Sequence, residues 1–183
     1  FLLAPEAGTP DAPLDRIAFE KAGIAKSGVP LVTHLYPSSM QRAIAGVVAK
    51  ARTTMLPRRE AWDVSMTESG FDYRDRHGAL CLPHPAMKGR HQVENAGLAI
   101  AMIRHQTALP VTEPAFSKGV AATRWPARMQ LLGRGPLTSL APDIAEIWLD
   151  GGHNPDAAAM LARHFSTRLD SLGKIHLILG MLA

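Results

Sequence analysis

Apolar positions recur along this chain with two different periods, and each period predicts one type of element. Spacings of three or four residues predict helices over the ranges 14–22, 38–51, 93–106, 115–123 and 155–169. Short apolar runs predict strands at 29–33, 144–149 and 175–179. Alternating positions predict a small antiparallel section from 62–66, 71–73 and 79–82. Because strands and helices follow one another, the pattern indicates an α/β fold with a mainly parallel sheet.

Two details of these helices can also be predicted. Ser38 or Ser39 is expected to cap the second helix, because a serine hydroxyl can accept from a first-turn amide. The helix over 93–106 is apolar on nearly all sides from 96 to 103. We therefore expect it to be buried all round.

The most informative turn has the sequence Asp-Gly-Gly-His-Asn-Pro, residues 150–155. An apolar run precedes it, Asn154 suits a helix N-cap, and Pro155 suits the first helical position. The expected strand, glycine turn and helix would lie at the carboxyl end of a strand, where open α/β sheets bind ligands. Helix N-terminal amides favour phosphate there. The alternative is an ordinary turn, in which Asp150 is an exposed carboxylate that contributes little to folding.

Four segments in this order resemble one enzyme family. Ahead of the turn at 150–155 come Ile-Ala-Phe-Glu-Lys-Ala-Gly-Ile (17–24), Gly-Arg-His-Gln-Val-Glu-Asn-Ala (89–96) and Trp-Pro-Ala-Arg-Met-Gln (125–130). Together they resemble the folylpolyglutamate synthase/dihydrofolate synthase family of Mur-ligase-like, ATP-dependent amide ligases. The resemblance implies part of a Mur-ligase-like central, ATP-binding domain over 1–125. It also implies the start of a Rossmann-like carboxy-terminal domain over 126–183.

The match to the family is incomplete. The P-loop motif Gly-x-x-x-x-Gly-Lys-Ser/Thr is absent from this chain, as are the metal-binding Glu and His that precede the Glu-Lys-Ala-Gly motif. Residues 1–13 do not resemble the family segment expected there. We therefore expect an internal portion of a larger enzyme, or ordered pieces of one joined in the numbering.

The resemblance assigns a catalytic role to Lys21. In similar enzymes this lysine is carbamylated and binds magnesium. Carbamylation converts an ammonium group into an oxygen-bearing anion, and hard Mg²⁺ prefers oxygen ligands. The alternative is a solvated lysine beside Glu20 on an exposed helix face.

The resemblance also assigns four residues to ATP. Asn95 would help hold the nucleotide, Arg128 would bind it through its planar fork, and Asp150 would accept from the ribose hydroxyls. His153 would donate to a phosphate or to the acyl phosphate, and is assigned a catalytic role as well. Each residue also has an alternative. Asn95 could be an amide bonded to the backbone, and Arg128 could form an ion pair between domains. Asp150 could be a satisfied turn carboxylate, and His153 a surface imidazole.

Composition excludes several classes of protein. Of 183 residues, 46% are hydrophobic and 20% charged, which is typical of a globular domain. No apolar run approaches the ~20 residues of a membrane span, and a single cysteine, Cys81, suits a reducing cytosol. The net charge is +4, but the basic residues are scattered. We therefore expect anionic small-molecule substrates rather than nucleic acid, no membrane partner, and a cytoplasmic monomer.

The predicted function is ATP- and Mg²⁺-dependent addition of L-glutamate to dihydropteroate, to folate polyglutamate, or to both, through an acyl phosphate. Two alternatives stay open at this point. One is another Mur-type amide ligase that acts on a cell-wall precursor. The other is a non-catalytic fragment that binds nucleotide, which the missing P-loop favours.

Overall fold

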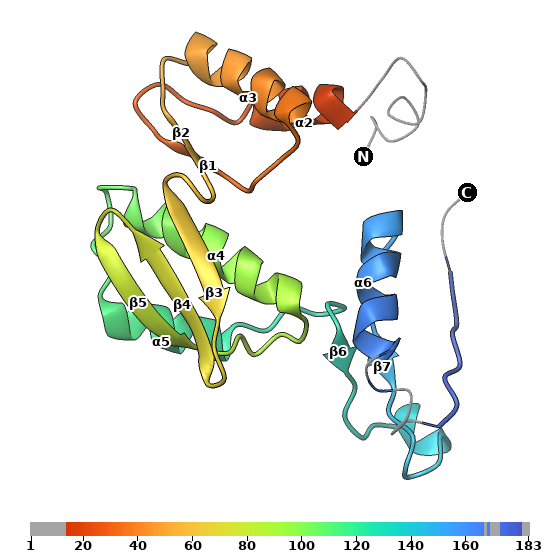
Figure 1. Cartoon of the computed structure of the whole chain (residues 1–183). Helices are drawn as coiled ribbons and strands as arrows, with labels where there is room; N and C mark the ends of the chain where they lie inside the picture. Colours follow the sequence, from red (N-terminus) through yellow and green to blue (C-terminus); the bar gives the residue numbers. More distant parts are fainter. Residues whose placement is uncertain (1–13, 167, 169–172, 181–183) are drawn as a thin grey trace. The chain divides into compact units, whose positions relative to one another are not determined.

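The computed structural model describes residues 14–166, 168 and 173–180 (Figure 1). The chain forms two compact units: the first comprises residues 1–84 and 93–121, and the second comprises 85–92 and 122–183. The unmatched residues 1–13 lie outside the described residues. The division into domains of 1–125 and 126–183 stays a prediction.

The first unit begins with a parallel βα segment. Its elements are α2 (Leu14–Ala22), β1 (Leu31–Thr33), α3 (Ser38–Lys50) and β2 (Met55–Pro57). β1 and β2 pair in parallel, and α2 and α3 pack through a small buried cluster of Ala18, Ala22, Ile44 and Val48. The predicted βα unit is confirmed, and β1–β2 is the parallel pair among the described strands. The predicted serine cap is wrong, because Pro37 occupies the cap position without a side-chain bond.

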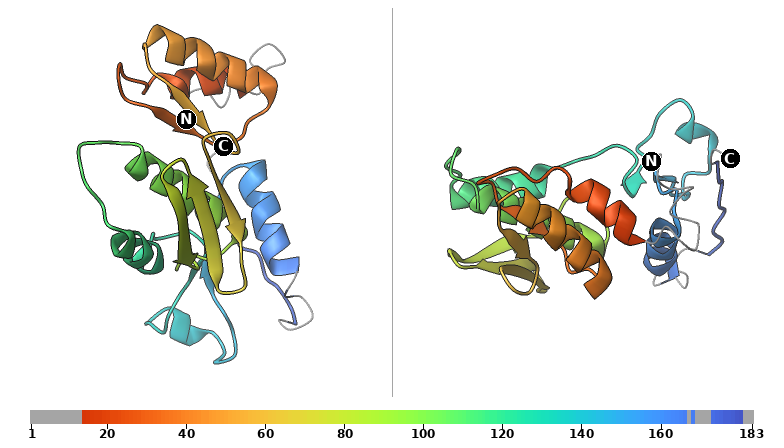
Figure 2. Two further views of the ribbon diagram at one scale, coloured as in Figure 1. Left: turned by 60° about the vertical axis from the view of Figure 1, so that its left-hand side comes forward. Right: turned by 90° about the horizontal axis from the view of Figure 1, so that it is seen from above.

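An antiparallel sheet forms the larger layer of the first unit. Its strands are β3 (Trp62–Met66), β4 (Gly70–Asp75) and β5 (Gly78–Pro83), in sequential order. The predicted antiparallel section is therefore confirmed. Helices α4 (Arg90–Arg104) and α5 (Glu113–Ala122) cover one face of the sheet (Figure 2). The core between them holds Trp62, Val64, Phe71, Tyr73, Leu80, Leu82, Val93, Ile100, Ala101, Phe116 and Val120.

Helix α4 is buried on one side only, which corrects the prediction that it is buried all round. Ile100 and Ala101 are 3% and 0% exposed, whereas Met102 and Ile103 are 49% and 38% exposed. The reason is that the sheet covers a single face of the helix. At the closest approach, a Cβ on Gly97 would lie 2.4 Å from Val64 Cγ1 and 3.0 Å from Trp62 Cζ3.

We expect Gly97→Ala to lower the free energy of unfolding by about 1–3 kcal/mol, because an added methyl group forces the helix away from the sheet. Gly46→Ala is the matched control: Gly46 lies inside α3, and nothing lies within 4 Å of the position of its missing Cβ. That change should stabilise by about 0.5–1 kcal/mol, since alanine restricts the unfolded chain. Urea unfolding of both variants tests the prediction, and equal effects of the same sign would contradict the close packing.

In the second unit one helix packs against a short strand pair. β6 (Gln130–Leu131) pairs antiparallel with β7 (Trp148–Leu149), a 3₁₀ turn spans Thr138–Leu140, and α6 runs over Pro155–Ser166. The Trp148 ring meets the Phe165 ring edge-on, with centroids 5.9 Å apart. This contact fixes α6 against β7 and confirms the predicted helix up to residue 166.

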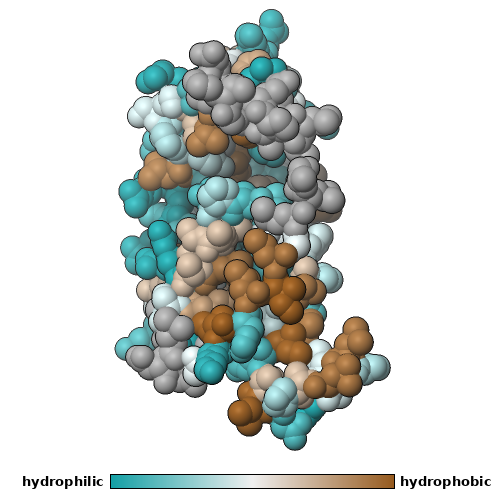
Figure 3. Space-filling model, turned by 90° about the vertical axis from the view of Figure 1, so that its right-hand side faces the viewer, coloured by the Kyte–Doolittle hydropathy of each residue, from teal (hydrophilic) through white to brown (hydrophobic). Residues whose placement is uncertain are grey.

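Two predicted strands in this unit are wrong in whole or in part. The strand predicted at 144–149 is reduced to its last two residues, and Ile144 is 95% exposed. Residues 173–180 form no strand, and Leu177 and Ile178 are 79% and 96% exposed. An apolar run becomes a strand only when a neighbouring backbone pairs with it, and among the described residues none pairs with 173–180. Figure 3 shows apolar side chains gathered on the face that lies to the right in Figure 1.

The predicted α/β class is confirmed, because helices and strands are mixed in both units. The described strands, however, form one parallel and two antiparallel sheets, so a mainly parallel sheet is not observed. Among the described helices, none has the length and apolar character needed to cross a membrane.

Candidate functional site

The Asp150 carboxylate joins two segments of the second unit. Its Oδ2 accepts from the Met129 N–H at 2.8 Å, and its Oδ1 accepts from the Gly152 N–H at 2.7 Å. The Gly151 N–H in turn donates to the Ala127 carbonyl at 2.8 Å. Asp150 is therefore a half-buried, doubly bonded carboxylate rather than the exposed one expected from sequence. Each oxygen keeps a second lone pair with which it can accept from a ligand.

These bonds hold the segment around Arg128 in an unusual conformation. Ala127 and Met129 have φ angles of 54° and 47°, in the left-handed region that non-glycine residues rarely adopt. Such residues persist only where their surroundings hold them. Here Met129 is 6% exposed and its N–H is bound by Asp150. Arg128 lies between them with an exposed side chain, so Asp150 acts on the backbone that presents this guanidinium.

His153 lies on the same turn and is exposed. Its Nδ1 is 3.1 Å from the Gly151 carbonyl oxygen. A carbonyl oxygen only accepts, so Nδ1 carries the proton in this contact. The opposite nitrogen, Nε2, can then donate to a phosphate only when the ring is an imidazolium.

The start of α6 matches its sequence prediction. The Asn154 side-chain oxygen accepts from the Ala157 N–H at 2.9 Å, and Pro155 is the first helical residue. This confirms Asn154 as the N-cap. The amides of Gly151, Gly152 and Ala157 are all bonded within the chain. A phosphate at this turn would therefore rely on side chains more than the usual helix N-terminus does.

The other two predicted site residues lie in the first unit. Lys21 is exposed in the last turn of α2, and the helix ends where the Gly23 N–H donates to the Glu20 carbonyl at 3.1 Å. Asn95 is exposed in the second turn of α4. The structure thus groups Arg128, Asp150 and His153 in one network and places Lys21 and Asn95 in the other unit.

Sequence reasoning missed the residue that anchors the Asn95 region. Arg58 follows β2, and its side chain is 17% exposed. Its Nε lies 2.8 Å from Asp63 Oδ1, and one terminal nitrogen lies 3.0 Å from Glu94 Oε1. Burial alone lowers the pKa of Arg58, but its hydrogen bonds to these two carboxylates outweigh burial and raise the pKa. Arg58 therefore ties the turn of α4 that carries Asn95 to the end of the parallel strand pair.

The cluster around Arg58 also includes His34, which directly follows β1. Its ring centroid lies 5.9 Å from that of Trp62. Burial lowers the pKa of His34, and the nearby Glu94 offsets part of that effect. The only sequence signal for this cluster is the position of His34 and Arg58 just after two apolar strands, the end of a parallel sheet at which ligands gather.

The sequence resembles several curated relatives. A folylpolyglutamate synthase of Lacticaseibacillus casei is 33% identical over 156 residues, which cover 76% of this chain and 32% of that relative. A dihydrofolate synthase/folylpolyglutamate synthase of Escherichia coli K12 is 30% identical over 169 residues, which cover 92% of this chain and 36% of that relative. This chain therefore spans about a third of the length of both relatives. No protein-family model matches the chain.

Solved structures agree with these relatives. A bifunctional folylpolyglutamate synthase/dihydrofolate synthase with Mn, AMPPNP and L-glutamate bound superposes with a TM-score of 0.70 at 26% identity, over 87% of this chain and 35% of that one. E. coli FolC in complex with DHPP and ADP gives a TM-score of 0.66 at 30% identity, over 91% of this chain and 35% of that one. The two-unit chain is thus similar in fold as well as in sequence to enzymes that bind adenine nucleotides.

Proposed function

Because this chain belongs to the folylpolyglutamate synthase/dihydrofolate synthase family, we propose that it takes part in ATP-dependent ligation of L-glutamate. The acceptor would be dihydropteroate, a folate polyglutamate, or both. The observation that carries the proposal is the network in which Asp150 links the glycine turn to the backbone beside Arg128. Relatives solved with AMPPNP and L-glutamate, and with DHPP and ADP, support this class of reaction.

Four residues are candidates for holding the nucleotide, each with a separate task. Arg128 offers a planar pair of donors to phosphate oxygens. Asp150 positions that arginine and offers its second lone pairs to ribose hydroxyls. His153 would add a donor from Nε2 only when both ring nitrogens carry protons, and Asn95 is a separate candidate that would offer its amide.

In the proposed reaction, the γ-phosphoryl group of ATP is transferred to the folate or pteroate carboxylate and ADP leaves. The amine of glutamate then attacks the carbonyl carbon of the acyl phosphate, loses a proton and forms the amide, while inorganic phosphate leaves. Arg128 and His153 would neutralise charge that develops on the transferred phosphoryl group. Positioning of the two reactants supplies much of the remaining rate acceleration.

Magnesium would supply charge neutralisation at the phosphates, with Lys21, as carbamyl-lysine, as its ligand from this chain. Among the described residues, no group of three or more His, Cys, Asp or Glu side chains can hold a metal ion. The described residues thus supply one candidate ligand for the metal. We further infer a cytoplasmic protein that acts on small molecules, from the lone Cys81 and the scattered basic residues. We also propose that it is a monomer.

We expect Arg128→Lys to lower kcat/KM for ATP by at least about tenfold, because lysine keeps the charge but loses the bidentate fork. The KM for the folate substrate should change little. The matched control is Arg134→Lys, since Arg134 is an exposed arginine of the same unit that pairs with Asp143. Steady-state release of ADP by the complete enzyme, with each substrate varied in turn, provides the test. ATP kinetics equal to those of the control would assign Arg128 a structural role.

A further inference from the structure

A cavity of about 530 Å³ opens in the first unit, and none of the residues proposed to bind nucleotide or magnesium lines it. It is bounded by the end of β2, the β2–β3 connection, the β4–β5 turn and the end of α4. Three arginines line it, Arg59, Arg74 and Arg76, and all three are exposed. Among the described residues none of the three forms an ion pair, whereas the neighbouring Arg58 and Arg104 do.

The carboxylates around this cavity do not cancel the three positive charges. Asp63 is paired with Arg58 at 2.8 Å, and Asp75 is paired with Arg104 at 2.9 Å. Glu60 is the remaining lining carboxylate. Arg76 Nε also donates to His77 Nε2 at 3.1 Å. Three lining guanidinium groups outside ion pairs thus face one such carboxylate, Glu60, and the cavity attracts anions.

A buried histidine adds an unsatisfied polar group to the wall. The His105 side chain is 1% exposed, and neither ring nitrogen has a hydrogen-bond partner within the described part of the chain. Its Nε2 lies 3.4 Å from Asp75 Oδ2. Buried polar groups without partners are uncommon in folded proteins, and each one calls for an explanation such as a bound water, ion or ligand.

The backbone of Arg59, at the edge of this cavity, has an unusual conformation. Its φ is 71°, and its N–H donates to the Trp62 carbonyl at 2.7 Å. A bulky side chain is rarely held in this left-handed conformation, and such residues cluster at ligand sites. The bond to Trp62 holds the backbone of Arg59, whose side chain lines the cavity.

We propose that this cavity binds a small polyanion, a molecule that carries several phosphate or carboxylate groups. Guanidinium groups from two segments, Arg59 on one and Arg74 with Arg76 on the other, would bind separate anionic groups. His105 would provide a further donor at the wall. The proposal is independent of the ligase reaction, because it uses none of that reaction's proposed residues.

The test is calorimetric titration of the whole protein with inorganic triphosphate and, separately, with citrate, at constant ionic strength and without ATP or glutamate. Replacing Arg59, Arg74 and Arg76 together by alanine should weaken binding of at least one probe by at least about tenfold. The probe that binds more tightly shows whether the cavity prefers phosphate or carboxylate groups. Probe addition should also shift the imidazole NMR signals of His105.

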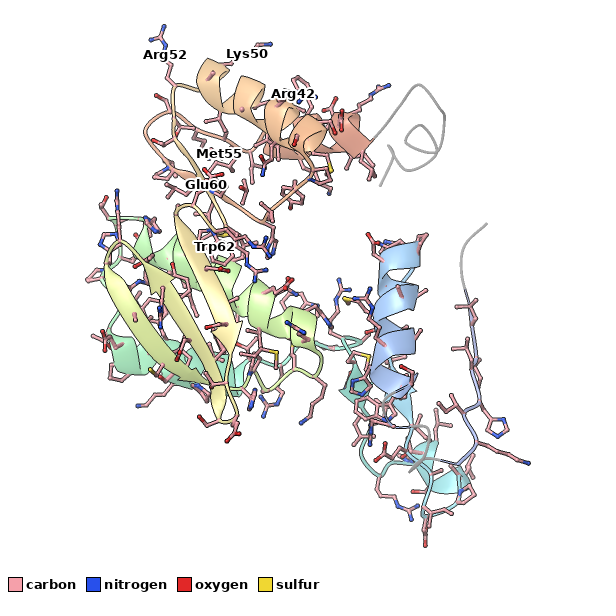
Figure 4. All side chains as sticks on the ribbon, in the orientation of Figure 1. Arg42, Lys50, Arg52, Met55, Glu60 and Trp62 are labelled. Atoms are coloured by element: carbon pink, nitrogen blue, oxygen red, sulfur yellow. The ribbon has the colours of Figure 1, made fainter. Side chains whose placement is uncertain are left out.

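The matched control replaces Arg42, Lys50 and Arg52 together by alanine. This control removes the same charge from exposed positions of the same unit, and Arg52 is also left-handed, with φ of 53°. Figure 4 shows Lys50 and Arg52 pointing outward from the end of α3, away from Glu60 and Trp62. Equal weakening by both triple variants would mean nonspecific attraction and would overturn the proposal.

Two further results would also overturn it. One is the absence of saturable binding of either probe to the wild-type protein. The other is binding that is lost in Arg128→Ala but retained in the triple variant at the cavity, which would place the probe at the proposed nucleotide site instead. Neither outcome contradicts the ligase proposal, which the ADP-release assay tests separately.

Discussion

Lys21→Ala is expected to lower the ligase activity of the complete enzyme by about a thousandfold or more. If Lys21 is carbamylated, the change removes the anion that would bind Mg²⁺, and loss of several kcal/mol of charge stabilisation corresponds to several factors of ten in rate. Steady-state ADP release measures the loss. Short carboxylic acids should restore part of the activity by replacing the missing anion.

The matched control is Lys26→Ala, because Lys26 is another exposed lysine of the same unit. Removing it should change activity little, since exposed charges contribute about 0–1 kcal/mol. Depleting carbon dioxide should lower the activity of the wild-type enzyme, and bicarbonate should restore it. An uncarbamylated Lys21 in a complete, metal-loaded, active enzyme would contradict the prediction.

Asp75→Asn is expected to lower the free energy of unfolding by about 3–5 kcal/mol, because removing one partner of a buried ion pair leaves the other charge uncompensated. The Asp75 side chain is 0% exposed and accepts two hydrogen bonds from Arg104, each at 2.9 Å, and one from Tyr73 at 2.9 Å. Asp143→Asn is the control, because its partner Arg134 is exposed and such pairs contribute about 0–1 kcal/mol. Chemical unfolding of both variants measures the difference.

The Asp75 contribution should also depend on pH in a defined direction. Burial alone raises the pKa of Asp75, but its hydrogen bonds from Arg104 and Tyr73 outweigh burial and lower the pKa. A carboxylate with a lowered pKa in the folded state stabilises fully above its unfolded pKa of about 4, and loses that contribution as pH falls through the folded value. The difference between wild type and Asp75→Asn should therefore be full at pH 7 and shrink below pH ~4.

Burial also lowers the pKa of His105, and the nearby Asp75 offsets part of that effect. The unfolded chain then binds a proton more readily, so the wild-type protein should begin to lose stability as pH falls below about 6.5. The variant His105→Gln should not lose stability in this pH range, which would assign this part of the pH dependence to His105. Unchanged pH dependence in that variant would contradict the assignment.

Local patterns in the sequence were sufficient to predict most helices. The start of α6 is a clear case, because Asn154 and Pro155 act on the first turn of the same helix and need no distant partner. Three antiparallel strands were likewise predicted from alternation and short turns. The four motifs are sufficient to indicate the family, since each is a short run of neighbouring residues.

Burial and pairing depended on contacts between distant segments. The sequence of α4 predicted a helix buried all round, but only one face meets the sheet. Residues 175–179 are apolar enough for a strand, yet among the described residues no strand pairs with them. The spacing of apolar residues indicates which of them could be buried, whereas the tertiary structure decides which of them another element covers.

The candidate site shows the same division. By itself the sequence determined the residue types at the turn, and it predicted Asp150, His153 and Arg128 as candidates. Only the tertiary structure decided that the Asp150 carboxylate binds the Met129 amide, 21 positions away, and that Arg58 joins Glu94 near Asn95. The physical reason is that a hydrogen bond between distant residues forms only after the chain between them has folded. The spacing of neighbouring residues does not show which distant segments this folding brings together.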